Sequence, residues 1–155
     1  MSSILTLALS MILLCLQSPA STLRDADKVV IDEFISSQAT RERGEEYEDA
    51  RKVVAGDLNH DGAPDAAVLY TIEGQDGSNN YVQYLAVFAR VKGRLVHLTH
   101  TEVGGKSNRS VELEAISKNV ILVKTLSYAA GDAACCPSKK GAARYALIKD
   151  RLKQI

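Results

Sequence analysis

The chain has 155 residues, of which 46% are hydrophobic and 25% are charged, a composition that suits an ordinary soluble domain. Lysine and arginine together number 19, as do aspartate and glutamate, so the formal net charge is zero. This balance argues against a nucleic-acid-binding protein, which usually carries a basic surface, and gives no reason to expect electrostatic attachment to a membrane.

Residues 1–20 are predicted to form a secretory signal peptide. Residues 4–16 are almost wholly apolar and uncharged, and the segment 18–20 offers small residues where a signal peptidase cleaves. The apolar run is too short for a transmembrane helix. The segment departs from the usual signal-peptide pattern in one respect, since no Lys or Arg precedes the apolar run. We therefore expect a periplasmic or secreted protein with no membrane insertion after cleavage, and a single α+β domain over 21–155.

Residues 25–35 are predicted to form the first helix. Aspartates lie in its first turn, where the positive end of the helix dipole favours them. Four apolar side chains with helical spacing form one stripe that we expect to face a core: Val30, Ile31, Phe34 and Ile35. Residues 41–48 are a charged connector.

Residues 57–65 carry the most informative pattern of the chain. Side chains with oxygen atoms occupy alternate positions, with a gap at Ala63, and a Ca²⁺ loop supplies its six to eight oxygen ligands in this way. Gly62 occupies the sixth position, where a sharp turn favours a residue without Cβ. The expected ligands are the side chains of Asp57, Asn59, Asp61 and Asp65, the last directly or through water, and the backbone carbonyl of Ala63.

The loop differs from a helix–loop–helix calcium site. Position twelve holds Val68 instead of a glutamate, and the flanking segments 51–56 and 66–72 favour strands, so we expect a hairpin over 51–72. The missing glutamate predicts a modest affinity, with a Kd of about 10⁻⁴ to 10⁻³ M. A metal-free acidic turn is the alternative, because Asp and Asn hydrogen-bond their own backbone and Asp-Gly favours hairpins.

Residues 56–65 resemble the Ca²⁺ loop of FG-GAP and VCBS-type repeats, which also lies between β-strands. The resemblance covers about twenty residues and a single copy, so it does not imply the propeller that repeated copies build. It implies a structural ion held by the five residues named above, and no catalytic role for that ion.

Beyond residue 80 the pattern is mostly that of strands. Residues 81–89 are apolar on both faces and are expected to form a central strand. Further strands are predicted over 94–99, 110–116, 120–126, 144–148 and 151–155, with a long loop over 128–141. Because short links join antiparallel neighbours, we expect an α+β fold in which the N-terminal helix packs on a mainly antiparallel meandering sheet of about seven strands.

Two adjacent cysteines, Cys135 and Cys136, remain after signal cleavage. A strained vicinal disulfide, two free thiols, and interchain pairing or soft-metal binding all stay open. The loop 132–140 is either redox-sensitive, with neighbouring lysines stabilising a thiolate, or a rigid crossover that contains Pro137. Its Cys-Cys-Pro-Ser segment also resembles small secreted bacterial proteins of unassigned activity.

No nucleophile elbow or phosphate-binding glycine loop occurs in the sequence. His97 and His100 are three residues apart, which on a regular strand places them on opposite faces and makes a poor metal pair. His60 is expected to face solvent. Glu112 and Glu114 share one face of a strand, where alternating acids on a solvated surface are the simpler interpretation.

These observations favour an exported, non-enzymatic binding or interaction domain, stabilised by a structural Ca²⁺ in the loop 57–65. A periplasmic inhibitor or immunity-type protein, which binds a protein partner through its loops, is one variant of this hypothesis. The alternative is a redox-active or thiol-dependent protein that uses Cys135 and Cys136.

Overall fold

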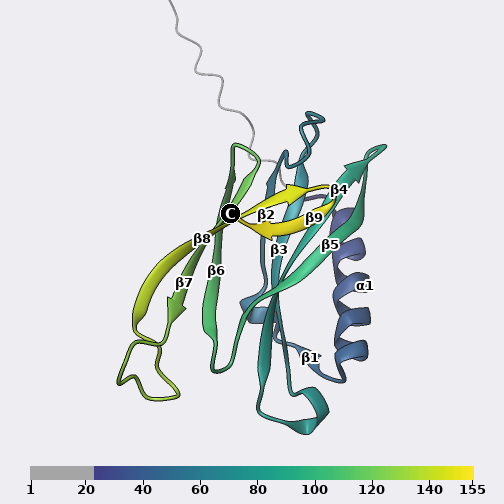
Figure 1. Cartoon of the computed structure of the whole chain (residues 1–155). Coiled ribbons are helices and arrows are strands. Elements are labelled where there is room, and N and C mark those ends of the chain that lie inside the picture. Colours follow the sequence, from purple (N-terminus) through teal and green to yellow (C-terminus); the bar gives the residue numbers. More distant parts are fainter. Residues whose placement is uncertain (1–22) are drawn as a thin grey trace, which may run out of the picture.

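The computed structural model describes residues 23–155, so the predicted signal peptide lies outside the described residues (Figure 1). Within this range one helix precedes nine strands, and no helical segment there is long and apolar enough to cross a bilayer. The elements are α1 (Asp25–Glu42), β1 (Glu45–Glu46), β2 (Lys52–Gly56), β3 (Asp65–Glu73), β4 (Tyr81–Val91), β5 (Arg94–Gly105), β6 (Arg109–Ser117), β7 (Val120–Ser127), β8 (Lys139–Ile148) and β9 (Arg151–Gln154), with short 3₁₀ turns η1 (Glu48–Ala50) and η2 (Gln75–Gly77).

The strands form two antiparallel sheets, which confirms the predicted α+β class and strand pairing. In the first sheet, β1 and β2 both pair with β3, which pairs with β4, which pairs with β5. The second sheet has the order β6-β7-β8-β9. A single meandering sheet of about seven strands was the finer expectation, but the link over residues 106–108 carries the chain from one sheet into the other instead of continuing the meander.

β5 and β6 do not pair as neighbours in one sheet, and the two sheets contact each other in other ways. The buried side chain of Gln83 on β4 accepts a hydrogen bond from the Val111 backbone N–H (2.7 Å) and donates one to the Val111 carbonyl (3.1 Å). β2 also lies close to β6, because Gly56 faces Ile116, and a Cβ at Gly56 would lie only 2.8 Å from Ile116 Cγ2. The second sheet is therefore stacked on the first.

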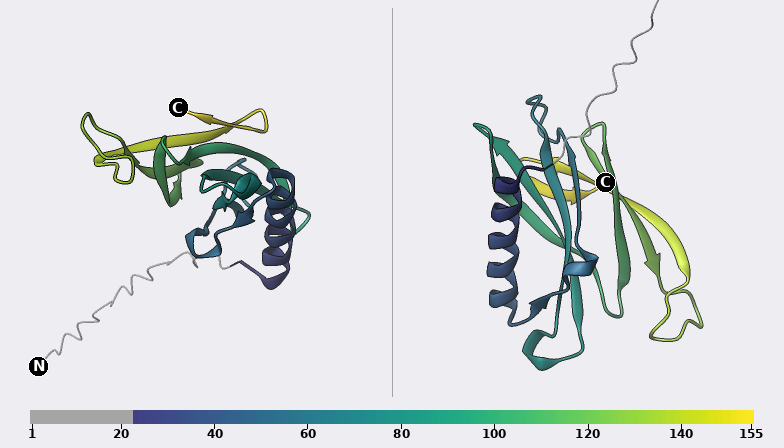
Figure 2. Two further views of the ribbon diagram at one scale, coloured as in Figure 1. Left: turned by 90° about the horizontal axis from the view of Figure 1, so that it is seen from below. Right: turned by 180° about the vertical axis from the view of Figure 1, so that it is seen from behind.

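The molecule has three layers, with α1 on one face of the first sheet and the second sheet on the other (Figure 2). The predicted apolar stripe faces the core, since Ile31 and Ile35 are buried and Val30 and Phe34 pack against the same cluster. β3 and β4 carry core side chains on both faces, which confirms the central strand predicted over 81–89.

The start of α1 is tied to the end of β4 by a buried ion pair. Asp27 is 2% exposed and accepts hydrogen bonds from Arg90 (Nη2 to Oδ2, 2.9 Å) and Arg24 (Nη2 to Oδ1, 3.0 Å). These hydrogen bonds, that from Arg90 above all, hold the pKa of Asp27 well below its usual range against the opposing effect of burial. Arg90 also donates to the Pro64 carbonyl, so one guanidinium joins α1, β4 and the segment before β3.

Arg90→Ala removes the main partner of this buried carboxylate. We expect the free energy of unfolding, measured by chemical denaturation at pH 7, to fall by about 3 kcal/mol, as is usual when one member of a buried pair is deleted. Lys28→Ala is the control, because it removes only the exposed pair between Lys28 and Asp25 and should leave stability unchanged. Similar small losses in both variants would contradict the assigned role of Arg90.

Candidate functional site

The acidic loop connects β2 to β3, whose antiparallel pairing places Gly56 opposite Asp65. The strand–loop–strand arrangement predicted over 51–72 is therefore confirmed. Four of the five predicted ligands lie on the loop itself, whereas Asp65 is the first residue of β3. The loop thus divides into an exposed turn and a buried base.

Asp57 organises the first half of the exposed turn. Its Oδ1 accepts a hydrogen bond from the His60 backbone N–H (2.8 Å), and its Oδ2 accepts one from the Gly62 backbone N–H (3.1 Å). Desolvation raises the pKa of Asp57, but the backbone hydrogen bonds, that from Gly62 first, outweigh it and leave the pKa below its ordinary value. His60 and Gly62 have left-handed backbones (φ 66° and 80°), and His60 is exposed as predicted.

Asn59 and Asp61 continue the same pattern. Asn59 Oδ1 accepts a hydrogen bond from the Asp61 backbone N–H (3.0 Å), and Asp61 Oδ1 accepts one from the Ala63 backbone N–H (2.8 Å). The Asn59 amide also donates to Asp61 Oδ2 (2.9 Å), so these two side chains are in contact. Side-chain oxygens at positions one, three and five therefore lie on one exposed turn, which fits the donor chemistry of a hard cation.

Asp65 forms the buried base of the loop and is only 1% exposed. Its Oδ2 accepts a hydrogen bond from the Leu58 backbone N–H (2.9 Å), and its Oδ1 accepts one from the Arg90 backbone N–H (2.8 Å). Among residues 23–155, no three His, Cys, Asp or Glu side chains are grouped closely enough to hold a metal ion. The assignment of Asp65 as a ligand stays a prediction, while its contacts establish that it closes the loop.

The base of the loop also reaches the second sheet. Leu58 is buried in the core between the sheets, and Asn119 in the β6–β7 turn donates a hydrogen bond to the Asp57 carbonyl (2.7 Å). The sequence alone did not identify Asn119 or Arg90 as parts of this site, since both come from distant hairpins. The turn is consequently braced by elements of both sheets.

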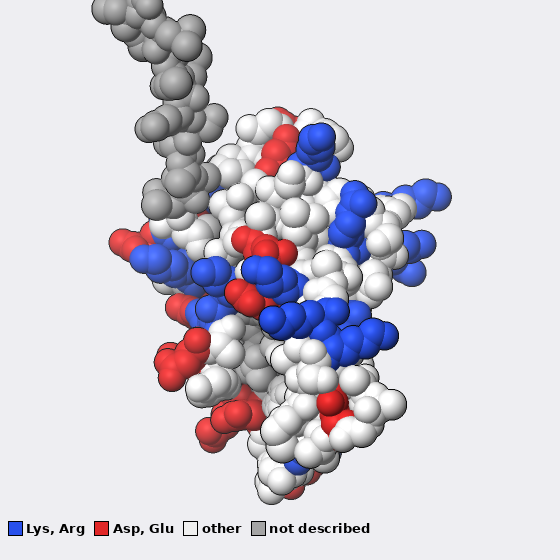
Figure 3. Space-filling view, turned by 90° about the vertical axis from the view of Figure 1, so that its left-hand side faces the viewer, with Lys and Arg blue, Asp and Glu red and all other residues white. Residues whose placement is uncertain are grey.

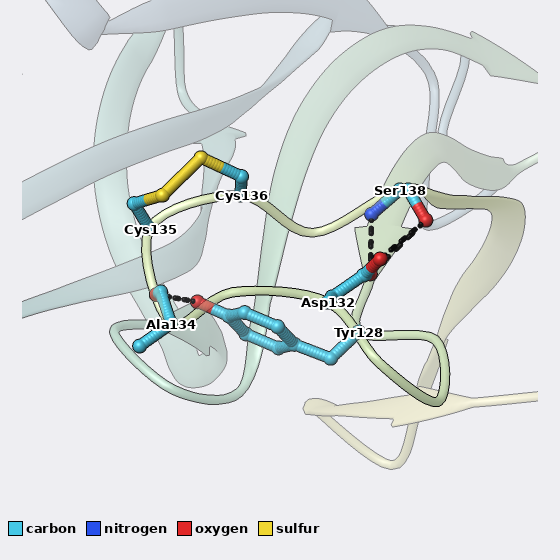
Figure 4. Close-up of a disulfide and its surroundings, with 6 residues drawn as sticks. All are labelled: Tyr128, Asp132, Ala134, Cys135, Cys136 and Ser138. Atoms are coloured by element: carbon cyan, nitrogen blue, oxygen red, sulfur yellow. Dashed lines mark hydrogen bonds between the residues drawn. A yellow bond between two sulfur atoms is a disulfide. The ribbon is translucent and has the colours of Figure 1, made fainter.

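The two cysteines form a vicinal disulfide in the exposed connection between β7 and β8 (Figure 4). Asp132 orders this connection, because its carboxylate accepts hydrogen bonds from the Ala129 N–H (2.7 Å), the Ser138 N–H (2.8 Å) and the Ser138 hydroxyl (2.8 Å). These hydrogen bonds lower the pKa of Asp132. Of the chemical states that the sequence left open for these cysteines, the structure has the disulfide. It lies on an exposed loop that is ordered by the hydrogen bonds of Asp132.

His97 and His100 lie on the same face of the first sheet, so their predicted placement on opposite faces is wrong. The reason is a β-bulge in β5: Phe88 pairs with His97 and Val87 with Thr99, so the intervening residue has no partner and the alternation shifts. His100 Nδ1 lies 3.3 Å from His97 Nε2. The sequence offered no signal for this shift.

The histidine pair lies beside aromatic residues of the helix–sheet core. His97 is stacked on Phe34 of α1, with ring centroids 3.9 Å apart and planes at 17°. Burial, with a smaller effect of His100, lowers the pKa of His97 to about 4. Burial also lowers the pKa of His100. Arg41 of α1 lowers it further, and Glu42 of α1 opposes this effect.

The lowered pKa of His97 predicts a loss of stability in mild acid. Its folded pKa lies below the unfolded value of about 6.5, so the unfolded chain binds more protons between pH 6.5 and 4 and stability falls as the pH drops through this window. We expect a loss of about 1–2 kcal/mol, discounted because the ring stays partly exposed. Urea unfolding at pH 7 and pH 4.5 measures it. His97→Asn should reduce the change of stability with pH, and the control His60→Gln should not. Equal pH dependence of stability in the two variants would contradict an origin in His97.

Charge is distributed unevenly despite the zero total. Residues 109–155 carry nine basic and four acidic side chains, whereas residues 23–108 carry ten basic and fifteen acidic ones. Figure 3 shows Lys and Arg side chains gathered on the side of the molecule formed by the second sheet. We call its outer surface the basic face, to which exposed side chains on alternate positions of β7, β8 and β9 contribute: Lys124, Lys140, Arg144 and Lys153.

Comparison with known protein families, with curated proteins and with solved structures found no match to this chain.

Proposed function

We propose that this chain is an exported, non-enzymatic binding domain in which the loop 57–65 takes a structural Ca²⁺. The observation that carries this proposal is the placement of the Asp57, Asn59 and Asp61 side chains at alternate positions of one exposed turn, from whose backbone N–H groups their oxygens accept hydrogen bonds. When bound, the ion would neutralise the carboxylates and fix the turn in one geometry. The Ala63 carbonyl, Asp65 and water would complete its oxygen shell, with Asp65 retaining its hydrogen bonds to the backbone.

The bracing of the loop supports a structural role for the ion. Asn119 joins the turn to the second sheet, and Asp65 joins it to β3 and β4. A cation that fixes the turn would therefore hold the same end of both sheets. Because these contacts join backbone groups to the buried Asp65 and the half-buried Asn119, they favour stabilisation over a reaction at the ion.

The basic face supports the binding part of the proposal. It is a solvated sheet surface on which basic side chains outnumber acidic ones, although the chain as a whole is neutral, and this excess favours electrostatic steering toward an oppositely charged protein partner. Lys124 on this face pairs with Glu114 of β6 (2.7 Å), so its charge is partly balanced there. Such a surface on a small protein suits one variant of the binding hypothesis, a periplasmic inhibitor or immunity-type protein.

The variants Asp61→Ala and Asp65→Ala distinguish the contribution of the ion to stability from that of the loop's own hydrogen bonds. At about 10 mM Ca²⁺ and the expected Kd, the ion should add roughly 1.4–2.7 kcal/mol to stability. Asp61→Ala should lose this increment in Ca²⁺ and change little in EDTA. Asp65→Ala should lose about 1–3 kcal/mol even in EDTA, because the backbone N–H groups of Leu58 and Arg90 lose their acceptor. In Ca²⁺ it should lose more, since a predicted ligand is removed as well.

Thermal and chemical unfolding in EDTA, Ca²⁺ and Mg²⁺ provide the measurement. Asp61→Asn is the matched control for the turn, since its amide oxygen can still accept the Ala63 N–H while the charge is lost. A melting temperature that does not rise with Ca²⁺, or an Asp61→Ala loss of equal size in EDTA, would contradict the calcium proposal.

The exposed disulfide favours one alternative function, a thiol-dependent protein. For this function we expect mild reductant to release two thiols per chain, detected with a thiol reagent, and the fold to survive because a bond between adjacent residues closes no long loop. Circular dichroism of the same sample checks the fold. Thiols that stay unreactive under mild reduction would leave the disulfide a structural feature only.

A further inference from the structure

We propose that His97 and His100 form a two-imidazole binding site for a late transition-metal cation such as Zn²⁺ or Cu²⁺, at the boundary between α1 and the edge strand β5. This site is separate from the acidic loop, and its existence does not rest on the calcium proposal. The juxtaposition that carries it is the distance of 3.3 Å between His100 Nδ1 and His97 Nε2, on one face of the sheet.

This distance matches the spacing that a metal requires of two nitrogen ligands. Metal–nitrogen bonds of about 2.0–2.1 Å at a tetrahedral angle place the two nitrogens about 3.3–3.4 Å apart. In the hydrogen-bonded pair, one of the facing nitrogens carries the proton. When that proton moves to the other nitrogen of the same ring, both facing nitrogens present lone pairs, and each imidazole stays neutral.

The backbone and the helix orient both rings before any ion binds. The bulge at Leu98 brings the two histidines to one face, and bulges commonly redirect a side chain next to a functional site. Phe34 holds both rings, stacking on His97 at 3.9 Å and meeting His100 edge-on at 5.4 Å. Little side-chain freedom would therefore be lost when the two rings bind a metal.

The donor atoms select the class of ion. Imidazole nitrogen suits Zn²⁺, Cu²⁺ and Ni²⁺, whereas Ca²⁺ and Mg²⁺ prefer oxygen ligands. Both rings are partly exposed, so water can fill the remaining coordination positions. With no third His, Cys, Asp or Glu grouped at this place in residues 23–155, the site would be an open one with two protein ligands. Affinity should rise toward Cu²⁺ in the usual order of divalent metals.

Isothermal titration calorimetry of the full protein with Zn²⁺ tests the proposal. The titration is run in about 10 mM Ca²⁺, which keeps the loop carboxylates occupied by a hard ion. We expect one Zn²⁺ per chain. His97→Gln or His100→Gln should weaken its binding more than about tenfold, since loss of even an outer-shell partner of a metal ligand costs about 10–100-fold. His60→Gln is the matched control, because His60 is the third histidine of the chain and lies exposed on the acidic loop, and it should leave the affinity unchanged.

A second measurement on the unaltered protein avoids dependence on how the variants fold. Histidine ring resonances, followed by NMR during the Zn²⁺ titration, should shift for His97 and His100 and stay constant for His60. Absence of saturable binding, binding that survives both glutamine variants, or shifts confined to His60 would overturn the proposal. None of these results would bear on the calcium titration, since its readout is the effect of Asp61→Ala in Ca²⁺.

Discussion

Burial of both faces of β3 and β4 is the constraint on which the rest of the structure depends. Side chains from Ala66 to Ile72 are at most 5% exposed, so each face of these strands requires a cover. α1 covers one face through Ile31 and Ile35, and the second sheet covers the other through residues such as Leu113 and Ile121. Polar groups that enter these layers are costly to leave without a partner, because water is excluded there. Most find one inside the protein, whereas the buried Tyr70 hydroxyl and Thr71 Oγ1 on β3 have none within residues 23–155.

Those internal partnerships are also the joints between the layers. Asp27 joins the helix to β4, Gln83 joins the two sheets, and Asp65 joins the acidic loop to β3 and β4. Gln83 and Asp65 satisfy backbone groups, whereas Asp27 pairs with the Arg90 guanidinium, and all three side chains are buried. The acidic loop is therefore not an isolated surface turn. Any ion that orders the loop acts on a point where several elements already meet.

The sequence predicts the parts of this fold that depend on local pattern. The helical stripe that includes Ile31, the central strand over 81–89 and the hairpin around the acidic loop all follow from periodicity and turn chemistry. The second sheet does not, because the link over 106–108 has the length of an ordinary hairpin link. The histidine pair does not either, since the bulge at Leu98 is defined by pairing with β4. The state of Cys135 and Cys136 stayed open because several chemical states fit adjacent cysteines.

Donor chemistry separates the two candidate ion sites of this molecule. The exposed turn at Asp57 and Asp61 offers only oxygen, and its carboxylates carry charge that favours a hard divalent ion. His97 and His100 offer only neutral nitrogen beside aromatic rings, which gives a hard ion little compensation for lost water. One ion therefore cannot serve both places with comparable strength. Because the loop joins the two sheets and the histidines lie under the helix, the two ions would stabilise different layer contacts, and their effects on unfolding should be additive.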